Sequence, residues 1–462
     1  MKQFRVLVAV TLALVSVTQA IAEDAVGDWG GLLAGSIRVV VHIKKGADGK
    51  LSATLDSPDQ NGFGIPIDSV SATPDHLTFQ IMKYNSVFDG RWDKGQHGWV
   101  GTWTQGQVLP LVLTRLAGGS SAAPVRKRPQ ESAIASGTLP YTNKDVLFTN
   151  RVAPSVSLSG TLSIPKGHGP FRAVVLVAGS GPNTRDEAIL DHKVFLVLGD
   201  SLARRGVEVL RYDKRGIGQS TGSYKTATTR DFTSDADAAV KYLESRPEVN
   251  PKRVGLIGHS EGGLIVPAVA AEDPSVAFIV MLAGPGITGA ELLPEQAALI
   301  SAASGEATAK VAETKSFELK LYAAMVAAAD PTEAKSKATS MIDVLVTKKI
   351  LTQAVADSIL DQITSPWFEY FLAYDPVPTL EKVLVPVLAL NGSLDLQVPP
   401  ADDLPAIRRA LKQDHDVTIL ELDGLNHLFQ DAKTGSPSEY GTIEETFSPK
   451  ALKLIGDWVL KH

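Results

Sequence analysis

The chain has 462 residues, a formal net charge of −6 and no cysteine. Its 44% hydrophobic and 21% charged residues are ordinary for a globular protein and exclude a disordered chain or a collagen-like repeat. The lack of cysteine excludes disulfide scaffolds, thiol nucleophiles and metal sites built on thiolates. At this length two or three structural units are expected.

Residues 1–22 have the pattern of a secretory signal peptide. Lys2 and Arg5 precede an apolar run over Val6–Val17, and Ala20-Ile21-Ala22 forms a small-residue cleavage signal. A membrane anchor is the alternative, but it needs a longer apolar segment. We therefore expect cleavage after Ala22 and a secreted or periplasmic protein without stable membrane insertion. Cleavage takes the net charge from −6 to −8, and without a long basic block nucleic acid is not an expected partner.

Residues 23–116 are predicted to form a small all-β accessory domain with a barrel-like sheet. Short runs of period two, such as Ile37–Ile43 and Trp99–Trp103, alternate with turns, as antiparallel strands do. The tryptophans of this region are Trp29, Trp92, Trp99 and Trp103. Their indole rings are expected in the core, with ligand stacking as the alternative. Residues 117–145 are predicted to be a linker, because their first half is rich in Gly, Ser, Ala and Pro.

From residue 146 to residue 462 apolar strands alternate with helical segments. Runs such as Ala173–Ala178, Val207–Tyr212 and Val254–Gly258 are continuously apolar, which is typical of a parallel sheet covered on both faces. Residues 286–378 contain no such run and are predicted to be a helical cap over the carboxyl ends of the strands, where ligands bind. The predicted fold class is α/β, with a mostly parallel central sheet and helices on both faces.

The strongest chemical signal is Gly258-His259-Ser260-Glu261-Gly262, a G-x-S-x-G motif. It follows the strand Val254–Gly258 and precedes a helical run over Gly263–Ala271. A sharp strand-to-helix turn holds its serine in a strained conformation with the hydroxyl exposed. We therefore predict that Ser260 is a nucleophile; a serine that only caps the helix is the alternative.

A serine nucleophile needs a base and an acid, and in folds with this turn they follow in the order serine, acid, histidine. His427 lies just past the final strand and is the predicted base. Asp395 follows the preceding strand and is predicted to orient His427 and stabilise its imidazolium form. Asp423 is the rival acid, but it lies at the end of the histidine's own strand and more plausibly shapes the turn.

The oxyanion of an acyl-transfer intermediate needs two backbone N–H donors. One is predicted at Glu261, and the other in Gly179-Ser180-Gly181-Pro182, with Ser180 preferred and Gly181 next; a plain tight turn is the alternative for this loop. The segment Asp213–Ser220 lacks the ending of a phosphate loop. We expect it to be a structural turn in which Asp213 pairs with Arg215.

The aromatic segment 365–371 lies near the end of the predicted cap. Trp367 and Phe368 either line the substrate pocket or anchor the cap to the core, and both interpretations stay open. No metal and no organic cofactor are expected.

Together these motifs resemble the α/β-hydrolase superfamily and, more narrowly, exported two-domain bacterial carboxylesterases of the EstD-like type. The motifs that carry the resemblance are residues 179–182, 213–220 and 258–263, Trp367-Phe368, Tyr374-Asp375-Pro376, Asp395 and Asn426-His427. Residues 56–60 and 103–105 are similar to the accessory β-domain found before such hydrolases. One departure is Ala178, where the family usually has histidine, so the bracing of the oxyanion loop is expected to differ.

The resemblance implies hydrolysis of short-acyl esters without a metal or an organic cofactor. The leading hypothesis is therefore a serine carboxylesterase acting on a small-molecule ester through an acyl-enzyme. A serine peptidase or amidase with the same triad is the first alternative, and it would need a site for the charged terminus of a peptide. A cell-envelope ligand-binding protein with an inert hydrolase domain is the second. The sequence leaves a homo-oligomer open.

Overall fold

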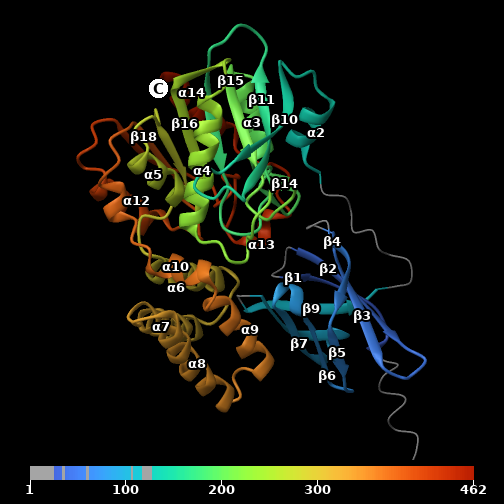
Figure 1. Ribbon diagram of the computed structural model, residues 1–462. Helices are drawn as coiled ribbons and strands as arrows, with labels where there is room; N and C mark the ends of the chain where they lie inside the picture. Colours follow the sequence, from blue (N-terminus) through green and yellow to red (C-terminus); the bar gives the residue numbers. More distant parts are fainter. Residues whose placement is uncertain (1–24, 34–36, 59–61, 106–107, 117–126) are drawn as a thin grey trace, which may run out of the picture. The chain divides into compact units, whose positions relative to one another are not determined.

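The computed structural model describes residues 25–33, 37–58, 62–105, 108–116 and 127–462 (Figure 1). The predicted signal peptide and the first part of the predicted linker lie outside the described residues. The chain divides into two compact units, Met1–Ala123 and Pro124–His462. Within the described ranges, no helix is long and apolar enough to cross a membrane.

The first unit is an antiparallel β-sheet, as predicted. Its strand order is β4-β3-β2-β1-β9-β8-β7-β6-β5. The strands are β1 (Gly27–Leu33), β2 (Ile37–Lys45), β3 (Leu51–Ser57), β4 (Gly62–Ile67), β5 (Ser69–Ala72), β6 (His76–Ile81), β7 (Ser86–Asp93), β8 (Gly98–Thr104) and β9 (Val108–Arg115). Strand β3 lies in contact with β5, and β4 with β6, so the sheet curls towards closure.

The core of this unit is aromatic. The indole of Trp29 is fully buried and meets the rings of Trp92 and Trp99 edge to face, each at 6.0 Å between centroids. Trp103 is also buried and packs against Phe79. The described tryptophans of this unit therefore pack with one another and with the core, which is the first of the two predicted roles.

The second unit is built on a mostly parallel sheet of order β10-β11-β15-β12-β16-β17-β18-β19. Its strands are β10 (Tyr141–Thr149), β11 (Ser157–Pro165), β12 (Phe171–Val177), β15 (Val207–Tyr212), β16 (Val249–His259), β17 (Ile279–Leu282), β18 (Val387–Gly392) and β19 (Val417–Leu422). Strand β11 is antiparallel to β10 and β15, and the pairs from β15 through β19 are parallel. A two-stranded ribbon of β13 (Ala188–Ile189) and β14 (His192–Lys193) lies beside it.

The predicted linker 117–145 contains regular structure that the sequence analysis did not anticipate. Helix α2 (Pro129–Ser136) falls inside it, and β10 begins at Tyr141 and pairs with β11 along its whole length. Strand β10 is an edge strand whose residues Thr142–Asp145 are exposed. Because such a strand needs no apolar run, hydrophobic periodicity does not reveal it.

Helices cover both faces of the second sheet (Figure 1). Helices α3 (Val194–Ala203) and α14 (Pro449–Lys461) pack together on one face, where Trp458 meets Phe278 edge to face. The other face is covered by α4 (Thr229–Glu244), α5 (Gly262–Glu272) and α12 (Pro400–Ala410). These helices pack on alternate residues of the strands and form a large apolar core with them. This is the predicted α/β architecture. The short helix α13 (Pro437–Tyr440) precedes α14.

Between β17 and β18 the chain is helical, as the absence of strand-like runs predicts. The helices are α6 (Gly289–Ala303), α7 (Thr308–Val326), α8 (Pro331–Thr347), α9 (Gln353–Ile363), α10 (Pro366–Ala373) and α11 (Val377–Leu380). Helices α6 to α10 form the cap below the sheet in Figure 1. The cap has an apolar core of its own, which includes Leu321, Ala338, Ile342 and Leu360.

Candidate active site

Ser260 lies on a sharp turn between β16, which ends at His259, and α5, which begins at Gly262. Its φ of +54° is in the left-handed region, which is strained for a residue with a Cβ. The flanking glycines are required by close backbone approach. A Cβ at Gly258 would lie 2.0 Å from the Gly262 carbonyl oxygen, and one at Gly262 would lie 2.1 Å from the Val177 carbonyl oxygen. The turn therefore has the geometry of the nucleophile elbow that the sequence predicts.

The predicted base and acid come from two other strand ends and meet. His427, past β19, places Nδ1 2.9 Å from Oδ2 of Asp395, which follows β18. The other carboxylate oxygen of Asp395 accepts from the backbone N–H groups of Gln397 at 2.8 Å and Val398 at 2.9 Å. The rival carboxylate, Asp423, is exposed on the turn after β19. Asp395 is thus the carboxylate that the structure brings to the histidine.

The predicted oxyanion loop lies against Ser260. A Cβ at Gly179 would come within 3.0 Å of the Ser260 Cβ. The amide of Asn183 donates to the carbonyl oxygens of Gly179 and Ser180, each at 2.9 Å, so both carbonyls are turned into the loop. The N–H of Gly179 donates to Oε1 of Glu187 at 2.6 Å. This buried carboxylate braces the loop that follows Ala178.

Glu187 also contacts His259, the residue before Ser260. Its Oε1 lies 3.1 Å from Nδ1 of His259, and Nε2 of His259 lies 2.9 Å from the carbonyl oxygen of His427. Glu187 and His259 are both buried. Sequence reasoning missed Glu187, because it lies in an irregular segment whose partners are 8 and 72 residues away.

The residue after Ser260, Glu261, is the centre of a second buried network. Its Oε2 lies 2.9 Å from the Lys214 ammonium, and its Oε1 accepts from the Thr229 hydroxyl at 2.7 Å. The indole N–H of Trp367, on cap helix α10, also donates to Oε1 at 2.7 Å. Only 1% of Glu261 is exposed. One carboxylate therefore connects the elbow, the loop after β15, the start of α4 and the cap.

The two predicted pocket residues have different surroundings. Phe368 is buried in the apolar core of the cap and packs edge to face on Tyr322. Trp367 stacks on Phe371 at 5.1 Å and packs against an apolar cluster at the boundary of the cap. That cluster comprises Leu264, Leu292, Phe371 and Val398. Phe368 thus holds the cap together, whereas Trp367 both anchors the cap and borders this cluster.

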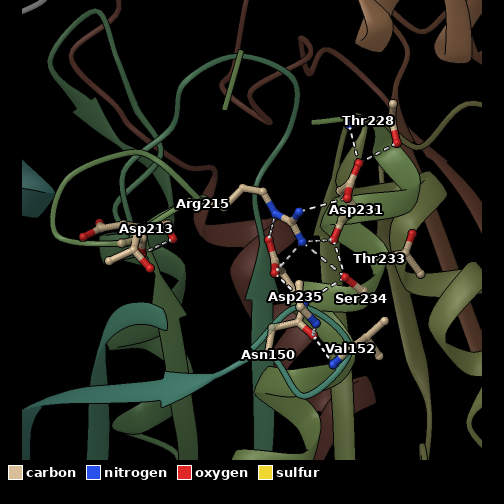
Figure 2. Close-up of polar contacts among 12 residues, drawn as sticks. Asn150, Val152, Asp213, Arg215, Thr228, Asp231, Thr233, Ser234 and Asp235 are labelled. Carbon is tan, nitrogen blue, oxygen red and sulfur yellow. Dashed lines mark hydrogen bonds and ion pairs between the residues drawn. The ribbon is translucent and has the colours of Figure 1, made fainter. Parts of the chain in front are cut away.

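The expected pairing of Asp213 with Arg215 is wrong. Arg215 extends to α4, where its guanidinium donates to Asp231 at 2.9 Å and to Asp235 at 2.7 Å (Figure 2). Asp213 points away from Arg215 and pairs with Arg185 at 2.8 Å. Burial alone would raise the pKa of Asp213, but the charge and hydrogen bonds of Arg185 outweigh burial and hold that pKa below its usual value. Although Asp213 and Arg215 are only two positions apart on the turn, their side chains point in different directions.

A family model described as "Serine aminopeptidase, S33" matches residues 191–430, just over half of the chain and including the elbow, Asp395 and His427. The chain belongs to this family. It is therefore a hydrolase of the α/β-hydrolase fold, in agreement with the sheet order and the elbow. In the part of the chain that the structure describes, no group of three or more His, Asp or Glu residues is placed to hold a metal ion.

The chain is also similar to individual proteins. "Esterase EstD" of Thermotoga maritima is 29% identical over 308 residues, which is 66% of each chain. An uncharacterised protein of Pseudomonas aeruginosa is 33% identical over 132 residues, 28% of this chain and 34% of that protein. The match thus leaves about a third of EstD and most of the second relative uncovered. The crystal structure of the α/β hydrolase GrgF from Penicillium superposes with a TM-score of 0.44 and 21% identity, covering 70% of this chain and 99% of that one.

Proposed function

We propose that this protein is a serine carboxylesterase that hydrolyses small short-acyl esters through an acyl-enzyme. The observation that carries the proposal is the contact of 2.9 Å between His427 Nδ1 and Asp395 Oδ2, in a molecule whose Ser260 occupies a strained elbow. The similarity to a protein named as an esterase supports the ester as the substrate class.

In this proposal the three side chains act in sequence. Ser260 Oγ attacks the ester carbonyl while Nε2 of His427 takes its proton, and Asp395 stabilises the imidazolium at Nδ1. The imidazolium then gives its proton to the departing alkoxide, which leaves as the alcohol and creates the acyl-enzyme. A water molecule, deprotonated by His427, attacks the acyl carbon. The carboxylic acid departs, and the proton returns to Ser260.

The oxyanion is assigned to the backbone N–H groups of Glu261 and Ser180. In the oxyanion loop, the N–H of Gly179 is taken by Glu187. Ser180 follows it at the exposed tip of the loop. This arrangement leaves Ser180 as the preferred second donor, with Gly181 next.

The apolar cluster of Leu264, Leu292, Phe371 and Val398 supports a limit on acyl length. Leu264 lies four residues after the nucleophile on α5, and Val398 lies three residues after the catalytic acid. Bulky buried side chains so close in the chain to the nucleophile and the acid are expected to restrict the space open to an acyl chain. Short acyl groups are therefore the substrates that this site favours.

A serine aminopeptidase is the second candidate, because the family model carries that description. Such an enzyme needs a carboxylate that is free to bind the ammonium group of a peptide. The two buried carboxylates that contact the elbow already have cationic or donor partners: Glu261 pairs with Lys214, and Glu187 faces His259. Rates on p-nitrophenyl butyrate and on alanine p-nitroanilide, measured with the same preparation, separate the two activities. The proposal expects the ester to be preferred by about 10³-fold or more in kcat/KM.

The proposal is tested by Ser260→Ala, with Ser336→Ala on the exposed surface of α8 as the matched control. Loss of the nucleophile should lower kcat on p-nitrophenyl acetate by about 10⁴-fold or more. The control should keep the activity of the parent protein. Full esterase activity in a folded Ser260→Ala variant would contradict the proposal.

A further inference from the structure

His259, the residue before the proposed nucleophile, has an acceptor at each ring nitrogen. Nδ1 lies 3.1 Å from a carboxylate oxygen of Glu187, and Nε2 lies 2.9 Å from the carbonyl oxygen of His427. A neutral imidazole has one N–H and can satisfy one of these acceptors, whereas an imidazolium satisfies both. The ring is 2% exposed, so water does not replace the missing donor.

The carboxylate facing His259 belongs to the same assembly. Glu187 is 1% exposed, and its Oε1 also accepts from the Gly179 N–H at 2.6 Å. A buried carboxylate without a cationic partner is costly, and His259 is the charged partner that the structure places against it. The pair thus contacts three segments whose relative positions matter for the proposed reaction: the oxyanion loop, the elbow and the backbone of His427.

We propose that His259 is held as an imidazolium at neutral pH by Glu187, and that this cation is a positioning residue which locks His427 against the elbow and sets the acid limb of the pH–rate profile. The inference rests on the proposed esterase activity, because His427 is the group whose protonation ends that activity in acid.

The charges around His259 support a protonated ring. Burial lowers its pKa, but the charge of Glu187, the hydrogen bond to Glu187, the His427 carbonyl and the charge of Asp395 outweigh burial, and the pKa lies above the usual value. The rings of His259 and His427 are 4.8 Å apart between centroids. A cation at this distance opposes a second positive charge on His427. Glu187 offsets it only partly, because it contacts Nδ1 of His259, whereas Nε2 of that ring contacts the backbone carbonyl oxygen of His427.

The protonation state can be observed directly in the unsubstituted protein. With ¹⁵N-labelled histidine, two-bond ¹⁵N–¹H correlation spectra show for each ring whether both nitrogens carry protons. The signals of His259 are those that disappear in His259→Asn. We expect both nitrogens of this ring to stay protonated at pH 7.5, about one unit above the ordinary histidine value. A single protonated nitrogen at that pH would overturn the proposal.

The kinetic test uses two neutral replacements that each keep one hydrogen bond. An asparagine amide at position 259 places its nitrogen near that of Nδ1 and can serve Glu187, while the longer glutamine can serve the His427 carbonyl. In both His259→Asn and His259→Gln, the acid limb of kcat/KM on p-nitrophenyl acetate should move up by about one pH unit, because the repulsion on His427 is lost. His168→Gln, on an exposed loop, is the control and should leave the limb in place.

The outcomes separate this inference from the proposed function. Loss of rate without movement of the limb in both folded variants means that His259 is structural only, and overturns the inference. Unchanged ester hydrolysis in Ser260→Ala overturns the proposed function instead. If neither replacement folds, the ¹⁵N measurement on the unsubstituted protein still decides the charge.

Discussion

Two buried ion pairs flank the elbow, one from each sequence neighbour of Ser260. On one side His259 faces Glu187, and this pair forms hydrogen bonds within the α/β body, with the Gly179 N–H and the backbone carbonyl of His427. On the other side Glu261 pairs with Lys214 and also accepts from Trp367 of the cap. The comparison shows that adjacent positions of one short motif serve different parts of the molecule. The first holds the catalytic loops in register, and the second connects them to the cap.

Substitutions in the His259–Glu187 pair and in the Glu261–Lys214 pair should therefore change different properties of the protein. A variant on the His259 side should alter the pH–rate profile and leave the acyl preference alone. A variant on the Glu261 side should alter stability and acyl preference and leave the acid limb alone. The following substitutions test this division.

The largest effect is expected from Lys214→Met. Lys214 is 4% exposed and its ammonium also lies 4.2 Å from the Phe232 ring, so methionine keeps the apolar contact and removes the charge. Glu261 then remains buried without its cation. The free energy of unfolding should fall by about 3–5 kcal/mol, measured by urea denaturation at pH 7.

The matched control is Lys320→Met, an exposed lysine on α7. It should change the free energy of unfolding by less than about 0.5 kcal/mol. Equal free energies of unfolding for the two variants would mean that the Lys214–Glu261 pair does not stabilise the α/β body. The distinct role proposed for the Glu261 side would then be wrong.

A smaller effect is expected from Trp367→Phe, which removes the indole N–H but keeps an aromatic ring to stack on Phe371. Glu261 retains Lys214 and Thr229, so the loss should be about 1 kcal/mol. The ratio of kcat/KM for p-nitrophenyl acetate over p-nitrophenyl octanoate should change by about fivefold, because the ring borders the apolar cluster at the cap.

The position of the acid limb supplies the control for Trp367→Phe. It should coincide with that of the parent protein, in contrast to the His259 variants. If Trp367→Phe changes both the acyl preference and the pH of the acid limb, the Glu261 side and the His259 side are coupled and do not act separately.

The smallest effect concerns the pH dependence of stability. Because the pKa of His259 is raised in the folded state, its protonation stabilises the fold fully below about pH 6.5 and progressively less as the pH rises through the folded value. The stability difference between the parent protein and His259→Gln should therefore narrow from pH 6 to pH 9. Urea denaturation of both proteins across this range measures it. A difference that stays constant would indicate a neutral His259.

Much of the site was predictable because the chemistry constrains chain order. The glycines around Ser260 and the strand before them predict the elbow, and the order serine, acid, histidine then selects Asp395 and His427 from many candidates. The structure places these two side chains in contact. The parallel sheet and the helical cap followed from the presence or absence of apolar runs.

The remaining features depend on contacts that no local pattern encodes. Glu187 and Lys214 reach the elbow from 72 and 47 residues away, and their neighbours in sequence have no distinctive pattern. Arg215 turns to α4 instead of to Asp213, because the direction of a side chain on a turn depends on backbone torsions that composition does not specify. The first half of strand β10 was missed because residues Thr142–Asp145 are exposed at the edge of the sheet.

The central claim is that Ser260 is the activated nucleophile of a serine esterase. Treatment of the folded protein with a fluorophosphonate, followed by digestion and mass spectrometry of the peptides, tests it most directly. We expect one stoichiometric adduct on Ser260, formed in the parent protein and absent from Ser260→Ala. No adduct on a folded sample, or an adduct that maps to another serine, would contradict it and favour a binding protein with an inert hydrolase domain.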